Sequence, residues 1–237
     1  MTDTARETVV LVPGLLCDRA VWAAQVEALS GDFNVQVPQL DSQDSIASMG
    51  RDVLALSSGP FSLVGHSMGG YVALEMMRQA PHRIRRLALL STQPRSDSSE
   101  QATRRRALFD DARRGLFTDV ISGFPALLFH ESRLDEPSLV DAFAEMGRRV
   151  GKEAFLRQQL AIMGRVDSVA SLPDISCPTL VLCGRQDLIT PRENSELMAA
   201  AIPGASLTVL GDCGHMAPME RPAAVNAALR EWMERRH

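Results

Sequence analysis

The stretch Phe61-Ser62-Leu63-Val64-Gly65-His66-Ser67-Met68-Gly69-Gly70 decides how this chain folds. Its first four residues predict a buried strand, and residues 71–80 repeat apolar side chains every three or four positions, which predicts a helix. Ser67 therefore stands on a sharp turn between strand and helix, within the pattern Gly-x-Ser-x-Gly. Such a turn strains the serine backbone and presents its hydroxyl at the top of a sheet as a nucleophile. The alternative is a glycine-rich connection in an ordinary α/β domain.

A serine nucleophile needs a base, and His215 is the candidate. It follows the apolar run 207–210, so we expect it on a loop at the carboxyl end of a late strand. Carboxyl ends of parallel strands share one edge of a sheet, the edge that also carries Ser67. Because the base must be neutral, we expect activity to rise with pH. The remaining histidines lie inside the turn, after a helix end, in a segment of unassigned position and at the last residue: His66, His82, His130 and His237.

Asp187 is the candidate for the carboxylate that orients the base. It ends Gly184-Arg185-Gln186-Asp187, which follows the apolar run 179–183, and it precedes His215 in the chain. The order serine, aspartate, histidine is the order that this strand-turn-helix chemistry uses. Asp212 is close to His215 in sequence, and Glu220 lies in the segment that leads to the last helix. A turn carboxylate is the alternative role for Asp187.

An oxyanion hole is expected from two backbone amides. The first apolar run, 9–12, is followed by Pro13-Gly14-Leu15-Leu16. An amide of this loop and the amide that follows the nucleophile can both point at a developing oxyanion. This interpretation assigns the two amides to Leu15 and Met68.

Taken together, these motifs resemble the α/β-hydrolase superfamily over nearly the whole chain. The closest resemblance is to small bacterial esterases and lactonases, such as pimeloyl-carrier-protein methyl ester esterases and enol-lactonases. The resemblance implies an α/β-hydrolase fold with a mostly parallel sheet flanked by helices, a small helical lid, and a triad of Ser67, Asp187 and His215. It also implies that no metal or organic cofactor is needed. One departure is Pro13-Gly14, where the family commonly has His-Gly.

Strands and helices alternate along the chain, which predicts a parallel sheet with right-handed crossovers. About six strands are expected, near residues 8–12, 34–38, 61–65, 86–90, 179–183 and 206–210. Helices are expected near residues 20–29, 45–57, 68–80, 191–201 and 222–235. We assign residues 1–92 and 172–237 to the hydrolase core.

Residues 93–171 show no strand pattern, and we call them the 93–171 insertion. Its position in the topology predicts a helical lid above Ser67. Most of its apolar side chains are expected in the core of the lid. The substrate pocket is expected to take a few of them, together with residues from below: Leu16, Phe124, Leu128, Phe129 and Met216. The run Arg104-Arg105-Arg106 is interpreted as a solvated helix face, with a docking patch for an acidic carrier protein as the alternative.

Bulk properties exclude several other classes of protein. The chain has 237 residues, a formal net charge of −4 and a pI of about 5.8, whereas nucleic-acid binding generally requires a basic surface. No apolar run has the length of a membrane span, and residues 1–7 lack the apolar core of a secretion signal. The four cysteines show no paired metal-ligand spacing and are expected as reduced thiols in the cytoplasm.

The sequence therefore predicts a serine hydrolase that cleaves a small carboxylic ester or lactone through an acyl-enzyme. The same scaffold supports acyl transfer, carbon–carbon bond hydrolysis and perhydrolysis, and motifs alone do not separate these reactions. A ligand-binding protein that keeps the triad without turnover is the alternative from another class.

Overall fold

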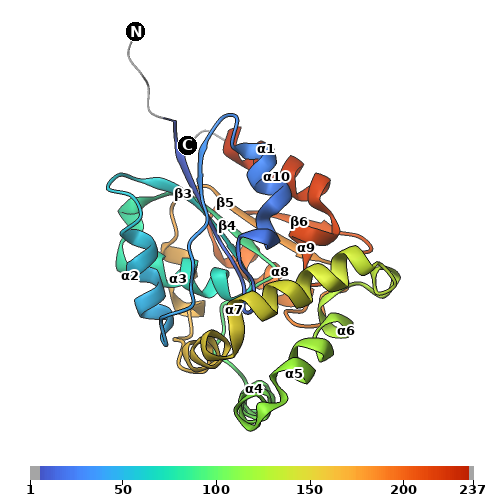
Figure 1. The fold of residues 1–237 in the computed structure, drawn as a ribbon. Coiled ribbons are helices and arrows are strands. Elements are labelled where there is room, and N and C mark those ends of the chain that lie inside the picture. The colour runs from blue at the N-terminus through green and yellow to red at the C-terminus, as the bar shows by residue number, and fades with distance from the viewer. Residues whose placement is uncertain (1–5, 235–237) are drawn as a thin grey trace.

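The computed structural model describes residues 6–234, so Arg235 and His237 lie outside the described residues. Its centre is a sheet of six parallel strands in the order β2-β1-β3-β4-β5-β6 (Figure 1). The α/β-hydrolase architecture expected from the sequence is confirmed. The strands are β1 (Thr8–Val12), β2 (Asn34–Gln36), β3 (Phe61–His66), β4 (Ile84–Leu90), β5 (Thr179–Gly184) and β6 (Ser206–Leu210).

Helices cover both faces of this sheet, which explains why the inner strands are apolar at almost every position. Successive side chains of β1 alternate between two hydrophobic clusters, with Val9 and Leu11 in one and Val10 and Val12 in the other. The first cluster is closed by α1 (Ala23–Leu29), α9 (Ala217–Glu220) and α10 (Pro222–Glu234). The second is closed by α2 (Ile46–Leu54), α3 (Met68–Gln79) and α8 (Arg192–Ala201).

The element boundaries differ from the sequence expectation by a few residues, for local reasons. β2 ends at Gln36 rather than at Pro38, because a proline has no N–H to donate to a ladder. α2 begins at Ile46 because the Ser45 side chain accepts a hydrogen bond from the Ser48 amide and so caps the helix. The helix expected over residues 20–29 is a 3₁₀ turn, Arg19–Trp22, followed by α1.

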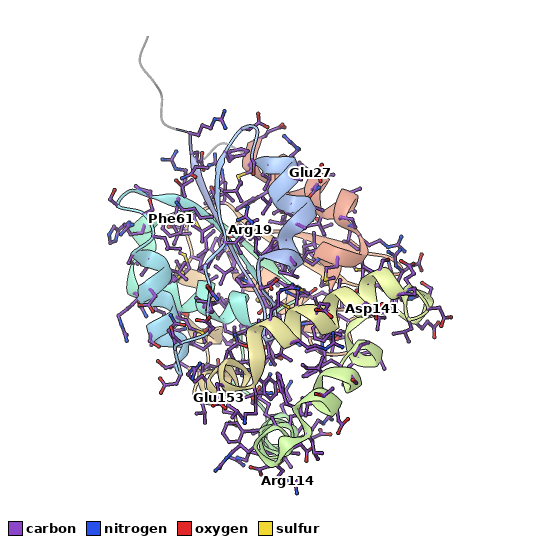
Figure 2. All side chains as sticks on the ribbon, viewed as in Figure 1. Arg19, Glu27, Phe61, Arg114, Asp141 and Glu153 are labelled. Carbon is purple, nitrogen blue, oxygen red and sulfur yellow. The ribbon has the colours of Figure 1, made fainter. Side chains whose placement is uncertain are left out.

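The 93–171 insertion leaves the sheet after β4 and returns at β5. Its helices are α4 (Ser99–Asp111), α5 (Phe117–Gly123), α6 (Pro125–Leu128) and α7 (Pro137–Met163). α7 breaks at Gly151, whose φ of 82° lies in the left-handed region, and the two halves run in different directions (Figure 1). Charged side chains such as Arg114, Asp141 and Glu153 lie on the outside of this layer (Figure 2).

The inner side of the insertion packs onto the first hydrophobic cluster. Phe143 and Phe155 of α7 are buried there beside Leu16 and Trp22 of the segment that follows β1. The insertion is thus part of the same packed molecule as the sheet, and its separation as a domain stays a prediction. Within residues 6–234, every helix is too short or too polar to cross a membrane.

Candidate active site

Ser67 lies at the turn between β3 and α3, in a backbone conformation that residues other than glycine rarely adopt. Its φ and ψ are 53° and −116°. Two hydrogen bonds hold the turn: the Ser67 amide donates to the carbonyl of Leu90 at 3.0 Å, and Thr92 Oγ1 donates to the carbonyl of Ser67 at 2.8 Å. A Cβ at Gly65 would run into the backbone of Gly69, so the turn requires a glycine there. The glycine of the sequence pattern is therefore what allows the tight turn that strains the Ser67 backbone.

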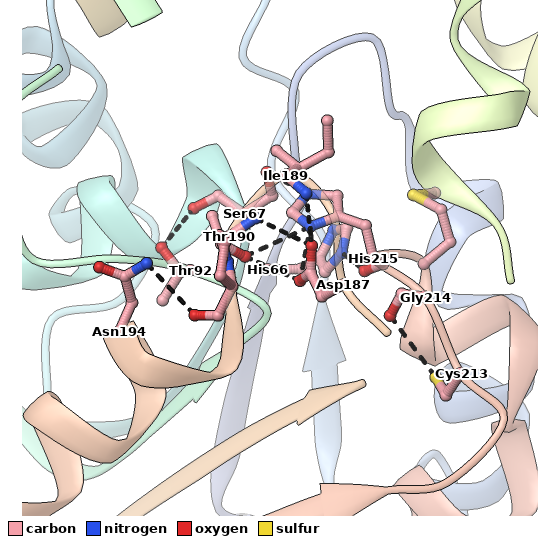
Figure 3. Close-up of polar contacts among 12 residues, drawn as sticks. His66, Ser67, Thr92, Asp187, Ile189, Thr190, Asn194, Cys213, Gly214 and His215 are labelled. Atoms are coloured by element: carbon pink, nitrogen blue, oxygen red, sulfur yellow. Dashed lines mark hydrogen bonds and ion pairs between the residues drawn. The ribbon is translucent and has the colours of Figure 1, made fainter. Parts of the chain in front are cut away.

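The structure brings Ser67, His215 and Asp187 into one hydrogen-bonded line (Figure 3). His215 Nε2 lies 2.8 Å from Ser67 Oγ, and His215 Nδ1 lies 2.9 Å from Asp187 Oδ2 and 3.0 Å from Oδ1. The histidine and the aspartate are buried, whereas the serine is half-buried and faces a cavity. This arrangement can take the proton of the serine hydroxyl and stabilise the resulting imidazolium.

Asp187 is held by its own loop as well as by the histidine. It accepts hydrogen bonds from the amides of Ile189 and Thr190, at 2.9 and 2.8 Å, and from Thr190 Oγ1 at 2.8 Å. Burial alone would raise the pKa of this carboxyl, but attraction to His215 and these hydrogen bonds outweigh it and lower the pKa below its ordinary value. The carboxylate is therefore held ionised beside the imidazole.

The loop that carries His215 is anchored by Glu220, which is 1% exposed. Its carboxylate accepts hydrogen bonds from the amides of Gly214 at 3.0 Å, Met216 at 3.1 Å and His130 at 2.8 Å. Glu220 thus supports the backbone and is not the partner of the imidazole. Asp212, the other competing carboxylate, is exposed and lies 3.4 Å from the guanidinium of Arg221.

His66 lies beside His215, with 5.2 Å between the ring centroids, and supports the same loop. Its Nε2 is 2.9 Å from the carbonyl oxygen of His215, so Nε2 carries the proton and donates it. The imidazole is buried against the edge of Trp22, and in residues 6–234 its Nδ1 has no partner. Burial, with the nearby His215, lowers the pKa of His66 from 6.5 to about 3, so the ring stays neutral.

The loop after β1 is fixed from above by the 93–171 insertion. Leu16 has a φ of 59°, and its amide donates to Gln158 Oε1 of α7 at 3.1 Å. Gln158 Nε2 in turn donates to the carbonyl of Leu40 at 2.7 Å. Leu15 lines the cavity, and Met68 begins α3 directly after Ser67. The two amides assigned to the oxyanion hole remain a prediction, with positions compatible with that role.

A cavity of about 530 Å³ lies between the insertion and the carboxyl edge of the sheet, and Ser67 and His215 open into it. Four of the five side chains expected in a pocket line it: Leu16, Phe124, Leu128 and Met216. Phe129 does not line it, and this expectation is wrong. Phe129 directly follows α6, and its buried ring packs against Phe143 instead, with 6.4 Å between the ring centroids.

The sequence-based interpretation also placed one arginine of the run 104–106 incorrectly. Arg104 and Arg106 are exposed, but Arg105 is 17% exposed and lines the cavity beside Gln159. Arg105 pairs with the buried Asp97, which pairs in turn with the buried Arg165. The interpretation of this run as a solvated face is therefore wrong for Arg105. Nothing in the charge pattern marks it, since only the finished fold brings Gln159, 54 positions away, beside it.

Two other kinds of reactive group to consider within residues 6–234 are a metal site and a reactive thiol. No group of three or more His, Cys, Asp or Glu side chains there is placed to hold a metal ion. Cys17 lines the cavity, but burial, with the charge of Asp18, raises the pKa of its thiol to about 12, so it is held as the neutral thiol. All four cysteines are buried free thiols.

Comparison with known proteins agrees with this geometry. The sequence profile of a family described as alpha/beta hydrolase fold matches residues 39–222. The chain belongs to the α/β-hydrolase fold family. A pimeloyl-acyl-carrier-protein methyl ester esterase from Nitrosomonas europaea is 29% identical to this α/β hydrolase over 224 residues, 87% of each chain.

Solved α/β-hydrolase structures superpose on nearly the whole chain. A thermophilic esterase from Thermogutta terrifontis, with malate bound, has a TM-score of 0.89 at 34% identity and covers 97% of this chain and 90% of its own. The enol-lactonase from Burkholderia xenovorans has a TM-score of 0.88 at 25% identity and covers 99% and 94%. The hydrolase expectation is confirmed at this level, and relatives of this α/β hydrolase include esterases and an enol-lactonase.

Proposed function

We propose that this protein is a serine hydrolase that cleaves a small carboxylic ester or lactone through an acyl-enzyme. The observation that carries the proposal is the line Ser67–His215–Asp187, closed by contacts of 2.8 and 2.9 Å at the edge of a cavity. The esterases and the enol-lactonase among the relatives support the same class of substrate.

In the first half-reaction Ser67 Oγ attacks the substrate carbonyl carbon while His215 Nε2 takes the hydroxyl proton. Asp187 stabilises the imidazolium that forms. The Leu15 and Met68 amides stabilise the oxyanion, and each such donor contributes about 3–4 kcal/mol of transition-state stabilisation. The tetrahedral intermediate then collapses, and His215 gives its proton to the leaving alcohol.

In the second half-reaction His215 takes a proton from water, and the hydroxyl oxygen attacks the acyl carbon. Collapse of this intermediate returns the proton to Ser67 and releases the acid. The 93–171 insertion acts as a lid that limits water and sets the size of the acyl and alcohol groups. A cavity of about 530 Å³ has the size of an ordinary small-molecule site, which is compatible with a small ester or lactone.

Turnover of p-nitrophenyl acetate and butyrate tests this function. The wild-type protein is expected to hydrolyse both esters, and Ser67→Ala is expected to lower kcat on the order of 10⁶-fold without loss of fold. Activity that survives this substitution would show that another group is the nucleophile. A folded wild-type protein that binds such esters without turnover would favour the ligand-binding alternative.

A further inference from the structure

One buried hydrogen-bond donor on the wall formed by α4 and α7 lacks an acceptor among the described residues, and a partly exposed guanidinium lies beside it. Arg105 and Gln159 both line the cavity that contains Ser67. Arg105 Nε donates to Asp97 Oδ2 at 2.7 Å and Nη1 donates to Gln159 Oε1 at 3.1 Å, so neither bond uses Nη2 of this side chain, which is 17% exposed. Gln159 is fully buried, and in the described chain its Nε2 has no hydrogen-bond partner. A buried donor without a partner is costly and calls for an explanation.

The ion pairs of the same wall join two guanidinium groups to one carboxylate. The side chains of Asp97 and Arg165 are each 3% exposed. The single Asp97 carboxylate pairs with two guanidinium groups, those of Arg105 and of Arg165, the latter at 2.8 Å. Arg165 is otherwise satisfied, since it donates to backbone carbonyls and lies 4.2 Å from the Tyr71 ring. The cluster of Arg105, Asp97 and Arg165 therefore has a net charge of +1.

One carboxylate that also lines the cavity forms its ion pair outside this cluster. Glu100, which also lines the cavity, forms an ion pair with Arg104 of the same helix. Because uncompensated charge is unfavourable in a partly buried site, the cluster is completed best by an anion that enters the cavity.

We propose that Arg105 and Gln159 bind a free carboxylate of the substrate, so that the enzyme acts on an ester or lactone that also carries an acid group. Arg105 Nη2 and Gln159 Nε2 each donate a hydrogen bond to this carboxylate. Its single negative charge matches the net +1 of the cluster, whereas a phosphate monoester brings a charge of about −1.5 to −2. The inference rests on the proposed function, because the carboxylate site and Ser67 share one cavity.

Matched pairs of esters test this inference. On the acyl side, the monomethyl esters of succinic, glutaric and adipic acid are compared with methyl butanoate, pentanoate and hexanoate. On the alcohol side, 3-acetoxypropanoate is compared with propyl acetate. The wild-type enzyme is expected to prefer the carboxylate member of at least one series by about tenfold or more in kcat/KM, as charge-assisted hydrogen bonds allow.

Two substitutions are expected to remove this preference, which is measured as the ratio of kcat/KM within each pair so that a change in the overall rate cancels. Gln159→Glu keeps the acceptor for Arg105, removes the Nε2 donor and adds a negative charge with no change in shape. Arg105→Met removes the cation. If the Arg105→Met variant does not fold, the Gln159→Glu variant alone is sufficient for the test. The control is Arg106→Gln, an exposed position on the same helix that does not line the cavity, and it is expected to keep the preference.

The outcomes separate this inference from the proposed function. Equal rates within every pair, or a preference that both variants retain, overturn the carboxylate site while hydrolysis of neutral esters upholds the proposed function. If no ester is cleaved, the proposed function fails, and calorimetric titration of glutarate into Ser67→Ala decides the carboxylate site alone. Binding that Gln159→Glu abolishes supports the site, and absence of binding overturns it.

Discussion

Gln158 of α7 accepts a hydrogen bond from the amide of Leu16 at 3.1 Å, and it thereby ties the 93–171 insertion to the loop beneath it. Leu16 has a φ of 59°, in the left-handed region that a leucine adopts only at a cost. Its neighbour Leu15 supplies one of the two amides assigned to the oxyanion hole. The insertion therefore covers the cavity and also fixes the backbone of a group proposed to act in catalysis.

Replacement of Gln158 by methionine is expected to lower kcat more than it raises KM. Methionine keeps the side-chain volume but cannot accept the hydrogen bond from the Leu16 amide. The loop is then expected to relax, so that the Leu15 amide no longer points at the oxyanion. A lost oxyanion donor lowers kcat about 10²–10³-fold, and a misaimed one is expected to cost about tenfold or more. Steady-state kinetics on a neutral ester measures this split. A variant with normal kcat and only a lower melting temperature would reduce Gln158 to a packing role.

Replacement of Asp187 by asparagine is expected to lower kcat about 10³–10⁴-fold. The asparagine NH₂ group cannot accept from His215 Nδ1, so the imidazole loses both its preferred tautomer and the charge that stabilises its protonated form. Thr190→Val is the matched control, because it removes one donor to the carboxylate and leaves the charge. The measurement is kcat of both variants at saturating ester. A kcat of the asparagine variant close to that of the Thr190→Val control would contradict the assignment of Asp187.

Replacement of Glu220 by glutamine is expected to destabilise the protein by about 1–3 kcal/mol and to lower kcat. The amide NH₂ group would face backbone N–H groups that now donate to a carboxylate, so one of the two oxygens becomes a donor that meets other donors. Urea unfolding and ester turnover measure both effects. Asp212→Asn, an exposed change on the same loop, is expected to alter neither.

His66 is expected to make the stability of the fold depend on pH. The pKa of His66 is about 3 in the folded protein and ordinarily 6.5. Between these pH values the imidazole is protonated in the unfolded chain and neutral in the folded protein. The resulting stability is complete above pH 6.5 and is lost as the pH falls toward 3, with a slope of about 1.4 kcal/mol per pH unit.

Urea unfolding between pH 7 and about 4.5 tests this slope, because that range lies above most of the carboxylate titrations. His66→Gln keeps a donor for the His215 carbonyl and removes the titrating group. The unfolding free energy of the wild-type protein is expected to fall more steeply toward acid than that of the variant. Parallel curves for the two proteins would show that His66 is protonated without penalty in the folded state.

The sheet and the placement of the triad candidates could be predicted because local signals and topology agree. Each inner strand is a continuous apolar run, and Ser67, Asp187 and His215 each follow one. In a parallel sheet with right-handed crossovers, the carboxyl ends of such runs meet at one edge without any knowledge of side-chain contacts.

The residues of the cavity wall could not be predicted in the same detail, because their contacts are between residues far apart in the sequence. Arg105 reads as one of three adjacent charged residues, and only packing of α4 against α7 places it beside Gln159, 54 positions away. Gln158 and Glu220 satisfy backbone groups whose orientation depends on the finished fold. Phe129 was misassigned because only the finished fold packs its ring against Phe143 and leaves the adjacent Leu128 to line the cavity.

The identity of the nucleophile is tested most directly by a fluorophosphonate probe, with the labelled peptide mapped by mass spectrometry. The account predicts a single adduct on Ser67 of the wild-type protein, slow labelling of a His215→Ala variant, and no labelling of folded Ser67→Ala. An adduct on any other residue of the wild-type protein, or labelling of Ser67 that is equally fast without the histidine, would contradict it.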